Sequence, residues 1–183
     1  MRYGWAEALS RTGQFYSAII GQFYPGVDNI AIRQCESLEK QSLSETQLTT
    51  LYYFLSNAWA NKQELNGKSK GWDWEQEEIE FQIINLRRAK NSPGFQKISK
   101  LRRCKILTNL GNLMDHIGRF VEAIEYWDCA ISVDPAFAMA LGNRGLGIKN
   151  YADILYDYGH KAVLYQSALS ALVFSFQNNI AIF

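Results

Sequence analysis

Small and large side chains recur at fixed intervals from Cys104 to Phe137, and this pattern constrains the fold more than any other part of the chain. Its small residues are Gly111, Ala123 and Ala130, and its large ones are Leu107, Leu110, Met114 and Trp127. Two antiparallel helices approach closely only where small residues face each other and large residues fill the gaps beside them. Gly118 lies between the two halves, where glycine can adopt the angles of a short turn. Asp134 ends the second half, because a residue before proline is disfavoured in a helix.

This pattern resembles the tetratricopeptide repeat (TPR), a helix-turn-helix unit of 34 residues. A second copy follows one repeat length later, and its markers are Leu141, Gly145 and Ile148. The copy departs from the family pattern after Ile148, and Asp157 is instead predicted to cap a last helix. Stacked repeats bury one another's outer faces, and about three are needed for stability. We therefore expect an all-α, TPR-like α-solenoid of antiparallel helix pairs.

The rest of the chain is predicted to form further helices around the clear repeat. One helical repeat domain is expected over 1–183, with degenerate repeats in 1–95, the clear TPR in 104–137, a divergent repeat and terminal helix in 138–176, and a tail in 177–183. Helices are predicted over 5–23, 28–40, 44–62, 97–117, 120–133 and 137–155, and between Asp73 and Pro93. Ser44 and Gln47 have the spacing of a capping box, and Asn66-Gly67 is predicted to be a turn.

The composition is that of a soluble globular protein, with 183 residues, 48% of them hydrophobic and 20% charged. The three cysteines are far apart and lack CxxC spacing, so no disulfide framework, metal site or cofactor is predicted. The first residues do not have the apolar core of a secretory signal, and a cytoplasmic location is expected. The apolar run Ala162–Phe176 is shorter than the roughly 20 residues that span a membrane, so a buried terminal helix is predicted instead.

The TPR resemblance implies a concave groove, lined by the first helix of each repeat, that binds an extended peptide or a partner helix. The implied groove residues are Lys105, Thr108, Asn112 and Asp115 from one repeat, and Met139, Asn143, Leu146 and Lys149 from the next. Asn112 and Asn143 match asparagines of chaperone-binding members, whose amides can pair with a peptide backbone. Both asparagines also fit a purely structural role. Thr108 replaces the lysine of that carboxylate clamp, so binding of a C-terminal carboxylate is not expected.

A cluster of cations lies between Glu80 and Asp115, a segment without acidic residues. Possible contacts to nucleic acid in this cluster are Arg87, Arg88, Lys97, Lys100, Arg102 and Arg103. Several such cations would give a salt-dependent, sequence-independent attraction to phosphates. The alternative is a solvated face that is balanced by the nearby acidic residues of 73–80.

A second resemblance concerns Gly142–Leu169, which is similar to the segment after the repeat in large bacterial TPR proteins that carry a C-terminal HEPN domain. HEPN ribonucleases typically need an arginine four to six residues before a histidine. Neither His116 nor His160 has such an arginine. Asp153, Asp157 and His160 could share a helix face and hold a metal, but capping and turn formation explain them better.

Together these features predict a protein-interaction module without enzymatic activity, as a fragment of a larger bacterial protein. A nucleic-acid-binding sensor arm of a HEPN-type ribonuclease, without its catalytic domain, is the alternative. No membrane association is expected, and the sequence indicates neither the partner nor the oligomeric state.

Overall fold

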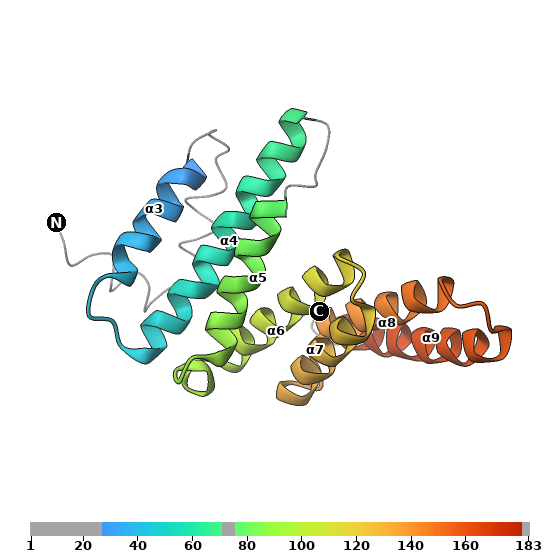
Figure 1. The fold of residues 1–183 in the computed structure, drawn as a ribbon. Coiled ribbons are helices and arrows are strands. Elements are labelled where there is room, and N and C mark those ends of the chain that lie inside the picture. Colours follow the sequence, from blue (N-terminus) through green and yellow to red (C-terminus); the bar gives the residue numbers. More distant parts are fainter. Residues whose placement is uncertain (1–26, 71–75, 181–183) are drawn as a thin grey trace. The chain divides into compact units, whose positions relative to one another are not determined.

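The computed structural model describes residues 27–70 and 76–180 of the protein. The described elements are α3 (Val27–Glu39), α4 (Glu45–Lys70), α5 (Gln76–Asn91), the 3-10 helix η1 (Phe95–Lys97), α6 (Lys100–His116), α7 (Phe120–Val133), α8 (Ala138–Asp153) and α9 (Tyr158–Ile180) (Figure 1). All of them are helical, which confirms the predicted all-α fold. The helix predicted over 5–23 and the helix start predicted at Asp73 lie outside the described residues.

The chain divides into two compact units, Met1–Ile98 and Ser99–Phe183. The sequence predicted one repeat domain over 1–183, with its degenerate part ending at residue 95. The unit boundary therefore falls between the segments that the sequence distinguished as degenerate repeats and as the clear repeat.

In the first unit, α4 packs against α3 and against α5 (Figure 1). Its core on the α3 side contains Ile32, Leu55 and Trp59, all buried. The Trp59 ring also stacks on Phe81 of α5, with 4.4 Å between the ring centroids. Buried Ser56 donates its hydroxyl hydrogen to the backbone oxygen of Gln82 at 3.2 Å. Helix α4 is thus held on two sides by apolar contacts and one buried hydrogen bond.

The capping box at the start of α4 is confirmed. The Ser44 backbone N–H donates to Gln47 Oε1 at 2.9 Å, and the Gln47 backbone N–H donates to Ser44 Oγ at 3.4 Å. The turn predicted at Asn66-Gly67 is wrong, because α4 continues to Lys70. A single glycine inside a helix costs only about 1 kcal/mol relative to alanine. Good helix formers such as Gln63 and Lys68 lie on both sides of it, so the helix is not interrupted.

Replacing Ser44 with alanine should lower the free energy of unfolding of the first unit by about 1 kcal/mol, the usual cost of losing a side-chain N-cap. The Gln47 backbone N–H would lose the Ser44 hydroxyl as its hydrogen-bond acceptor. Urea unfolding followed by circular dichroism measures the change. The matched control is Ser132→Ala, because among the described residues the Ser132 hydroxyl bonds only to the Asp128 carbonyl, one turn earlier in the same helix. Equal effects of the two substitutions would contradict the capping role.

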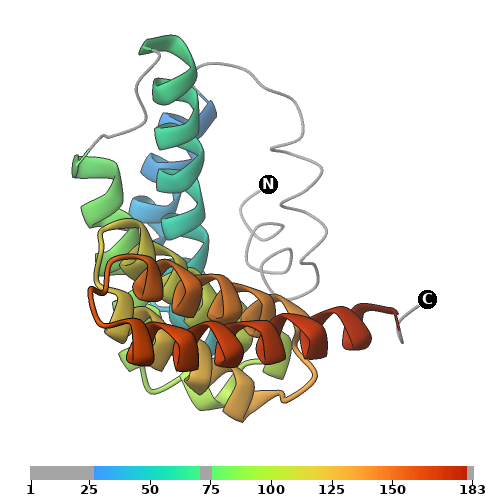
Figure 2. The ribbon, with the colours of Figure 1, turned by 90° about the vertical axis from the view of Figure 1, so that its right-hand side faces the viewer.

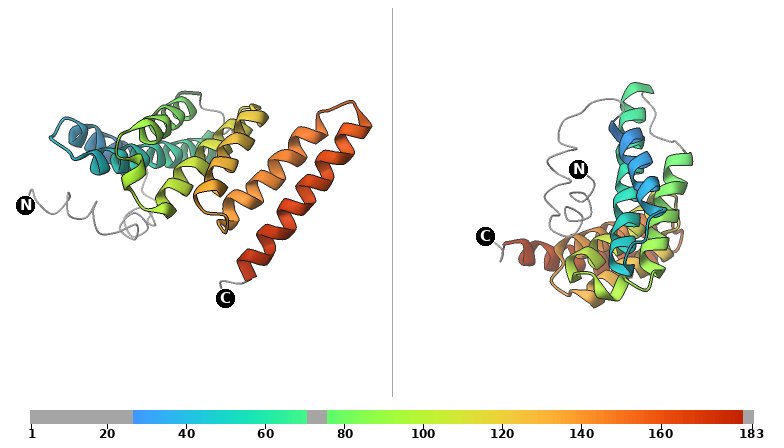
Figure 3. Two further views of the ribbon diagram at one scale, coloured as in Figure 1. Left: turned by 90° about the horizontal axis from the view of Figure 1, so that it is seen from below. Right: turned by 90° about the vertical axis from the view of Figure 1, so that its left-hand side faces the viewer.

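In the second unit, α6 and α7 form the predicted repeat hairpin, and α8 and α9 form a second hairpin (Figure 3, left). Gly118 has a positive φ of 81° at the turn between α6 and α7, as the sequence predicts. Asp134 is extended and ends α7 before Pro135. The Asp157 side chain accepts the backbone N–H of His160, so this residue caps α9 as predicted. Helix α6 begins at Lys100 rather than at residue 97, because Ser99 caps it and accepts the Arg102 backbone N–H.

Trp127 of α7 is the central large residue of the second unit and is 2% exposed. Gly111 of α6 and Gly147 of α8 both lie against its ring. A Cβ atom added at Gly111 would lie 2.5 Å from Trp127 Nε1, and one added at Gly147 would lie 2.1 Å from Trp127 Cζ3. The indole therefore fits against α6 and α8 only because both helices have no side chain there.

Two expectations for the last helix are wrong. The tail predicted over 177–183 is helical as far as Ile180. The predicted burial of Ala162–Phe176 is limited to Ala168 and Ser175, whereas most other side chains of this segment are half-buried or exposed. The apolar run predicts a covered helix, but among the described elements only α8 makes extensive contact with α9, which runs beside it (Figure 2).

Candidate functional site

The first helices of the two hairpins in the second unit, α6 and α8, are joined by the side chain of Asn112. Trp127 Nε1 donates to Asn112 Oδ1 at 3.1 Å, and Asn143 Nδ2 donates to the same oxygen at 2.8 Å. An indole N–H can only donate, so the atom that it meets must be the carbonyl oxygen of the amide. The Asn112 amide orientation is therefore fixed, and its Nδ2 group keeps two N–H donors on an exposed side chain.

A second polar link between α6 and α8 lies about one turn further along α6 and two turns further along α8. Asn150 Nδ2 donates to Asp115 Oδ2 at 3.4 Å. The other carboxylate oxygen, Asp115 Oδ1, is buried and has no hydrogen-bond partner in the described residues. Burial raises the pKa of Asp115, against the smaller lowering effects of the Asn150 hydrogen bond and of His116. Asp115 is therefore partly desolvated where α6 meets α8, and its Oδ1 atom is not accessible to a ligand.

Apolar side chains adjoin these polar groups on α8. Met139, Asn143, Leu146 and Asn150 follow one another at intervals of four, three and four residues, which places them on one side of the helix. Met139 and Leu146 are about half exposed. We call the surface made by Asn112, Asp115, Met139, Asn143 and Leu146 the α6–α8 face. It combines two oriented amides and a carboxylate with two accessible apolar side chains.

The structure does not bring all eight predicted groove residues to this surface. Thr108 is completely buried, so its side chain cannot contact a ligand. It lies four residues after Cys104 and three before Gly111, and both of these are buried in the same helix. Lys105 is exposed on α6. Lys149 is exposed and pairs with Asp153 within α8, with 2.7 Å between Nζ and Oδ2.

Two partners of the predicted residues were not identified from the sequence. They are the Trp127 indole, which fixes Asn112, and Asn150, which bonds to Asp115. A signal for Asn150 exists, since it follows Asp115 by 35 residues, about one repeat length. No sequence signal indicates the Trp127 hydrogen bond, because the repeat pattern requires only a large side chain at this position.

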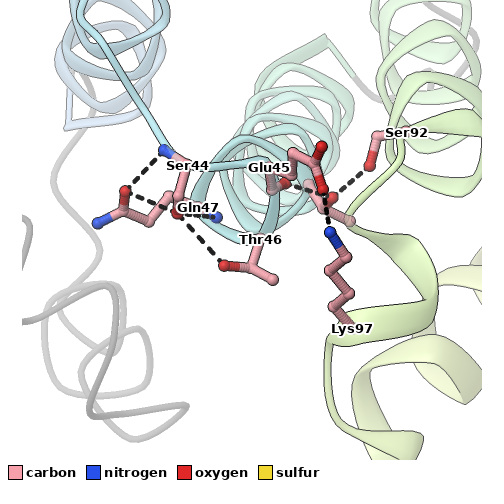
Figure 4. A network of polar contacts seen from close by, with 7 residues as sticks. Ser44, Glu45, Thr46, Gln47, Ser92 and Lys97 are labelled. Carbon is pink, nitrogen blue, oxygen red and sulfur yellow. Dashed lines mark hydrogen bonds and ion pairs between the residues drawn. The ribbon is translucent and has the colours of Figure 1, made fainter.

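The predicted nucleic-acid contacts fall in both units, three in each. Arg87, Arg88 and Lys97 belong to the first unit, and Lys100, Arg102 and Arg103 to the second. Arg88 lies 3.5 Å from Glu39 and over the Tyr52 ring, and Lys97 pairs with Glu45 beside the capping box (Figure 4). Two of the six cations are thus balanced by carboxylates other than those of 73–80. Nucleic-acid binding stays a prediction.

Asp153 and Asp157 lie near the turn between α8 and α9, and both have structural partners. Asp153 accepts hydrogen bonds from Lys149 and from the Tyr165 hydroxyl, and these bonds lower its pKa. Within residues 27–70 and 76–180, no group of three or more His, Cys, Asp or Glu side chains is arranged to hold a metal ion. The same ranges contain no helix that is both long and apolar enough to cross a membrane.

Helix hairpins that pack through matched small and large residues, with the first helices joined along one face, define a TPR-like helical-repeat protein. Two crystal structures of MamA, a protein with a TPR fold, are similar to this chain. One is 20% identical over 96% of this chain and 79% of MamA, with a TM-score of 0.61; the other is 22% identical over 94% and 72%, with a TM-score of 0.58. No family model matches the sequence, and no curated protein does. The similarity therefore concerns the fold.

Proposed function

We propose that this protein is a protein-interaction module, and that its α6–α8 face binds an extended peptide or a partner helix. The observation that carries this proposal is the fixed orientation of the Asn112 amide. Its oxygen is occupied by Trp127 and Asn143, while its Nδ2 donors remain on an exposed side chain. A donor that is already oriented loses little conformational entropy when a ligand carbonyl binds to it.

The neighbouring side chains support a peptide rather than a small polar ligand. Met139 and Leu146 lie on either side of Asn143 along α8 and offer accessible apolar surface. Methionine adapts its shape to irregular partners and is frequent at binding surfaces. A ligand that crosses α6 and α8 would hydrogen-bond to Asn112 and bury these two side chains. Recognition by backbone hydrogen bonds and side-chain contacts together is typical of peptide binding.

The Asp115 carboxylate favours one class of peptide ligand. Its Oδ1 atom is buried without a partner among the described residues, and its pKa is raised by burial. A lysine or arginine of the ligand placed beside the carboxylate would stabilise its ionised form by charge attraction, without contacting the buried Oδ1. We therefore expect ligands with a cation next to an apolar residue.

Selection from a random peptide display library against the full chain tests the proposal, followed by titration of a selected peptide. Asn112→Asp keeps an oxygen for Trp127 and Asn143 but removes the two N–H donors. It should weaken peptide binding about 5- to 150-fold, because a lost hydrogen bond that leaves a polar group unsatisfied costs about 1–3 kcal/mol.

The matched control is Asn91→Asp, the same chemical change on an exposed residue of the first unit. It should leave the affinity unchanged. Circular dichroism confirms that both variants fold. The proposal is wrong if no peptide is selected, or if the selected peptides bind the Asn112 variant as tightly as they bind the unchanged protein.

A further inference from the structure

Helix α9 has one face that is fixed by contact with α8. Ala168 and Ser175 are buried there, and the Ser175 hydroxyl donates to the backbone oxygen of Ala138 at 2.8 Å. Leu172 lies against Gly145, where an added Cβ would be 2.7 Å from Leu172 Cγ. This close fit sets the rotation of α9 about its own axis and therefore determines which side chains point away from α8.

The side chains that point away are also largely apolar. Leu169 is 62% exposed, Phe176 is 67% exposed and Val163 is 64% exposed. An apolar helix face is normally buried against a partner. No described element covers this part of α9, which lies at the end of the row of helices in the second unit (Figure 3, left). A contiguous apolar surface of this kind marks an interaction site.

One flank of α9 has a symmetric arrangement of residue positions. Its members are Ala162, Tyr165, Leu169, Val173 and Phe176, and we call them the α9 stripe. They follow one another at intervals of three, four, four and three residues, so the spacing is the same in both directions from Leu169. The Tyr165 hydroxyl donates to Asp153 of α8, which holds this ring at the edge of the stripe.

We propose that the α9 stripe is a dimerisation surface, on which α9 of a second copy packs antiparallel about a two-fold axis at Leu169. In a two-fold interface the same patch meets itself. Leu169 would then meet Leu169 of the second copy, Tyr165 would meet Val173, and Ala162 would meet Phe176. The two largest rings are thus paired with smaller residues, which is how facing helices fill space without voids.

Charge favours a second copy over other occupants. No charged residue is present from Ala162 to Gln177, so two copies of the stripe would not repel each other. An antiparallel pair also places opposite ends of the two helix dipoles together. Helices that lie on a membrane surface carry lysine or arginine on their polar side. The polar residues on the outer side of α9 are instead the uncharged Gln166, Ser167 and Ser170.

Sedimentation equilibrium of the full chain at micromolar concentrations tests this proposal. The unchanged protein should show a monomer–dimer equilibrium. Leu169→Lys should weaken dimerisation at least about 100-fold, since it removes a central apolar contact from both copies and places two cations opposite each other. Leu169→Glu should do the same. An equimolar mixture of the two variants should dimerise again, because residue 169 meets its own counterpart.

Val163→Lys is the matched control, since Val163 is equally exposed but lies outside the stripe. It should dimerise like the unchanged protein. The proposal is overturned if the protein is monomeric at all concentrations, or if the lysine and glutamate variants do not recover when mixed. It is also overturned if Val163→Lys weakens dimerisation as much as Leu169→Lys does, or if α9 binds vesicles of anionic lipid while the protein stays monomeric. Thermal melts of each variant show that α9 remains folded.

Discussion

Replacing Trp127 with alanine should lower the free energy of unfolding of the second unit by about 3–5 kcal/mol, the range for removing a large buried aromatic side chain. The indole is 2% exposed and fits against Gly111 of α6 and Gly147 of α8. Glycines cannot fill the space that the ring leaves, so a cavity would remain beside both helices. Amide hydrogen exchange of α6, α7 and α8 measures the loss within this unit.

Trp127→Phe separates the volume of the side chain from its hydrogen bond. Phenylalanine keeps most of the apolar contact but lacks the N–H that donates to Asn112 Oδ1. Asn143 still donates to that oxygen, so the oxygen is not left unsatisfied. The loss of stability should therefore be clearly smaller than for Trp127→Ala. Equal losses for the two variants would contradict the packing role given to the indole.

Replacing Gly147 with alanine should cost about 1–3 kcal/mol or more, because an inserted methyl group overpacks a filled interior. The new Cβ would lie 2.1 Å from Trp127 Cζ3, so α8 and the indole have to separate. Hydrogen exchange should show the loss of protection in α7 and α8. The effect should shrink in a Trp127→Phe background, since residues in contact are energetically coupled.

Gly159→Ala is the matched control for this substitution. A Cβ at Gly159 meets nothing closer than Asp157 Oδ1 at 3.5 Å, which is an ordinary contact. Its effect on the free energy of unfolding should be close to zero or slightly stabilising. If Gly147→Ala were as well tolerated as Gly159→Ala, the indole would not be confined between the helices as the structure places it.

The α6–α7 hairpin could be predicted closely from the sequence because its determinants are local. Gly118 sets the turn, Asp134 before Pro135 ends α7, and the alternation of small and large residues is contained in one repeat. The length of α4 could not be predicted in the same way. Asn66-Gly67 is a turn signal only where the surrounding residues do not favour the helix, and here they do.

The internal contacts of the candidate site could not be predicted from the sequence. The sequence left Asn112 either structural or ligand-binding; in the structure its oxygen is bonded internally and its nitrogen lies on an exposed side chain, and ligand binding stays a prediction. Thr108 follows the same family pattern yet is buried. The exposure of α9 was missed for a related reason, since an apolar run predicts burial but does not say whether a covering partner belongs to the same chain.

The most direct test of peptide recognition by the α6–α8 face is chemical-shift mapping of the side-chain amides while a selected peptide is added. We predict that the Asn112 Nδ2 resonances shift in proportion to the bound fraction, and that the Leu146 methyl groups shift with them. In the Asn112→Asp variant, which has no amide at residue 112, the Leu146 methyl shifts should be smaller at the same peptide concentration. Saturable binding that leaves the resonances of Asn112 and Leu146 unmoved would contradict the proposal.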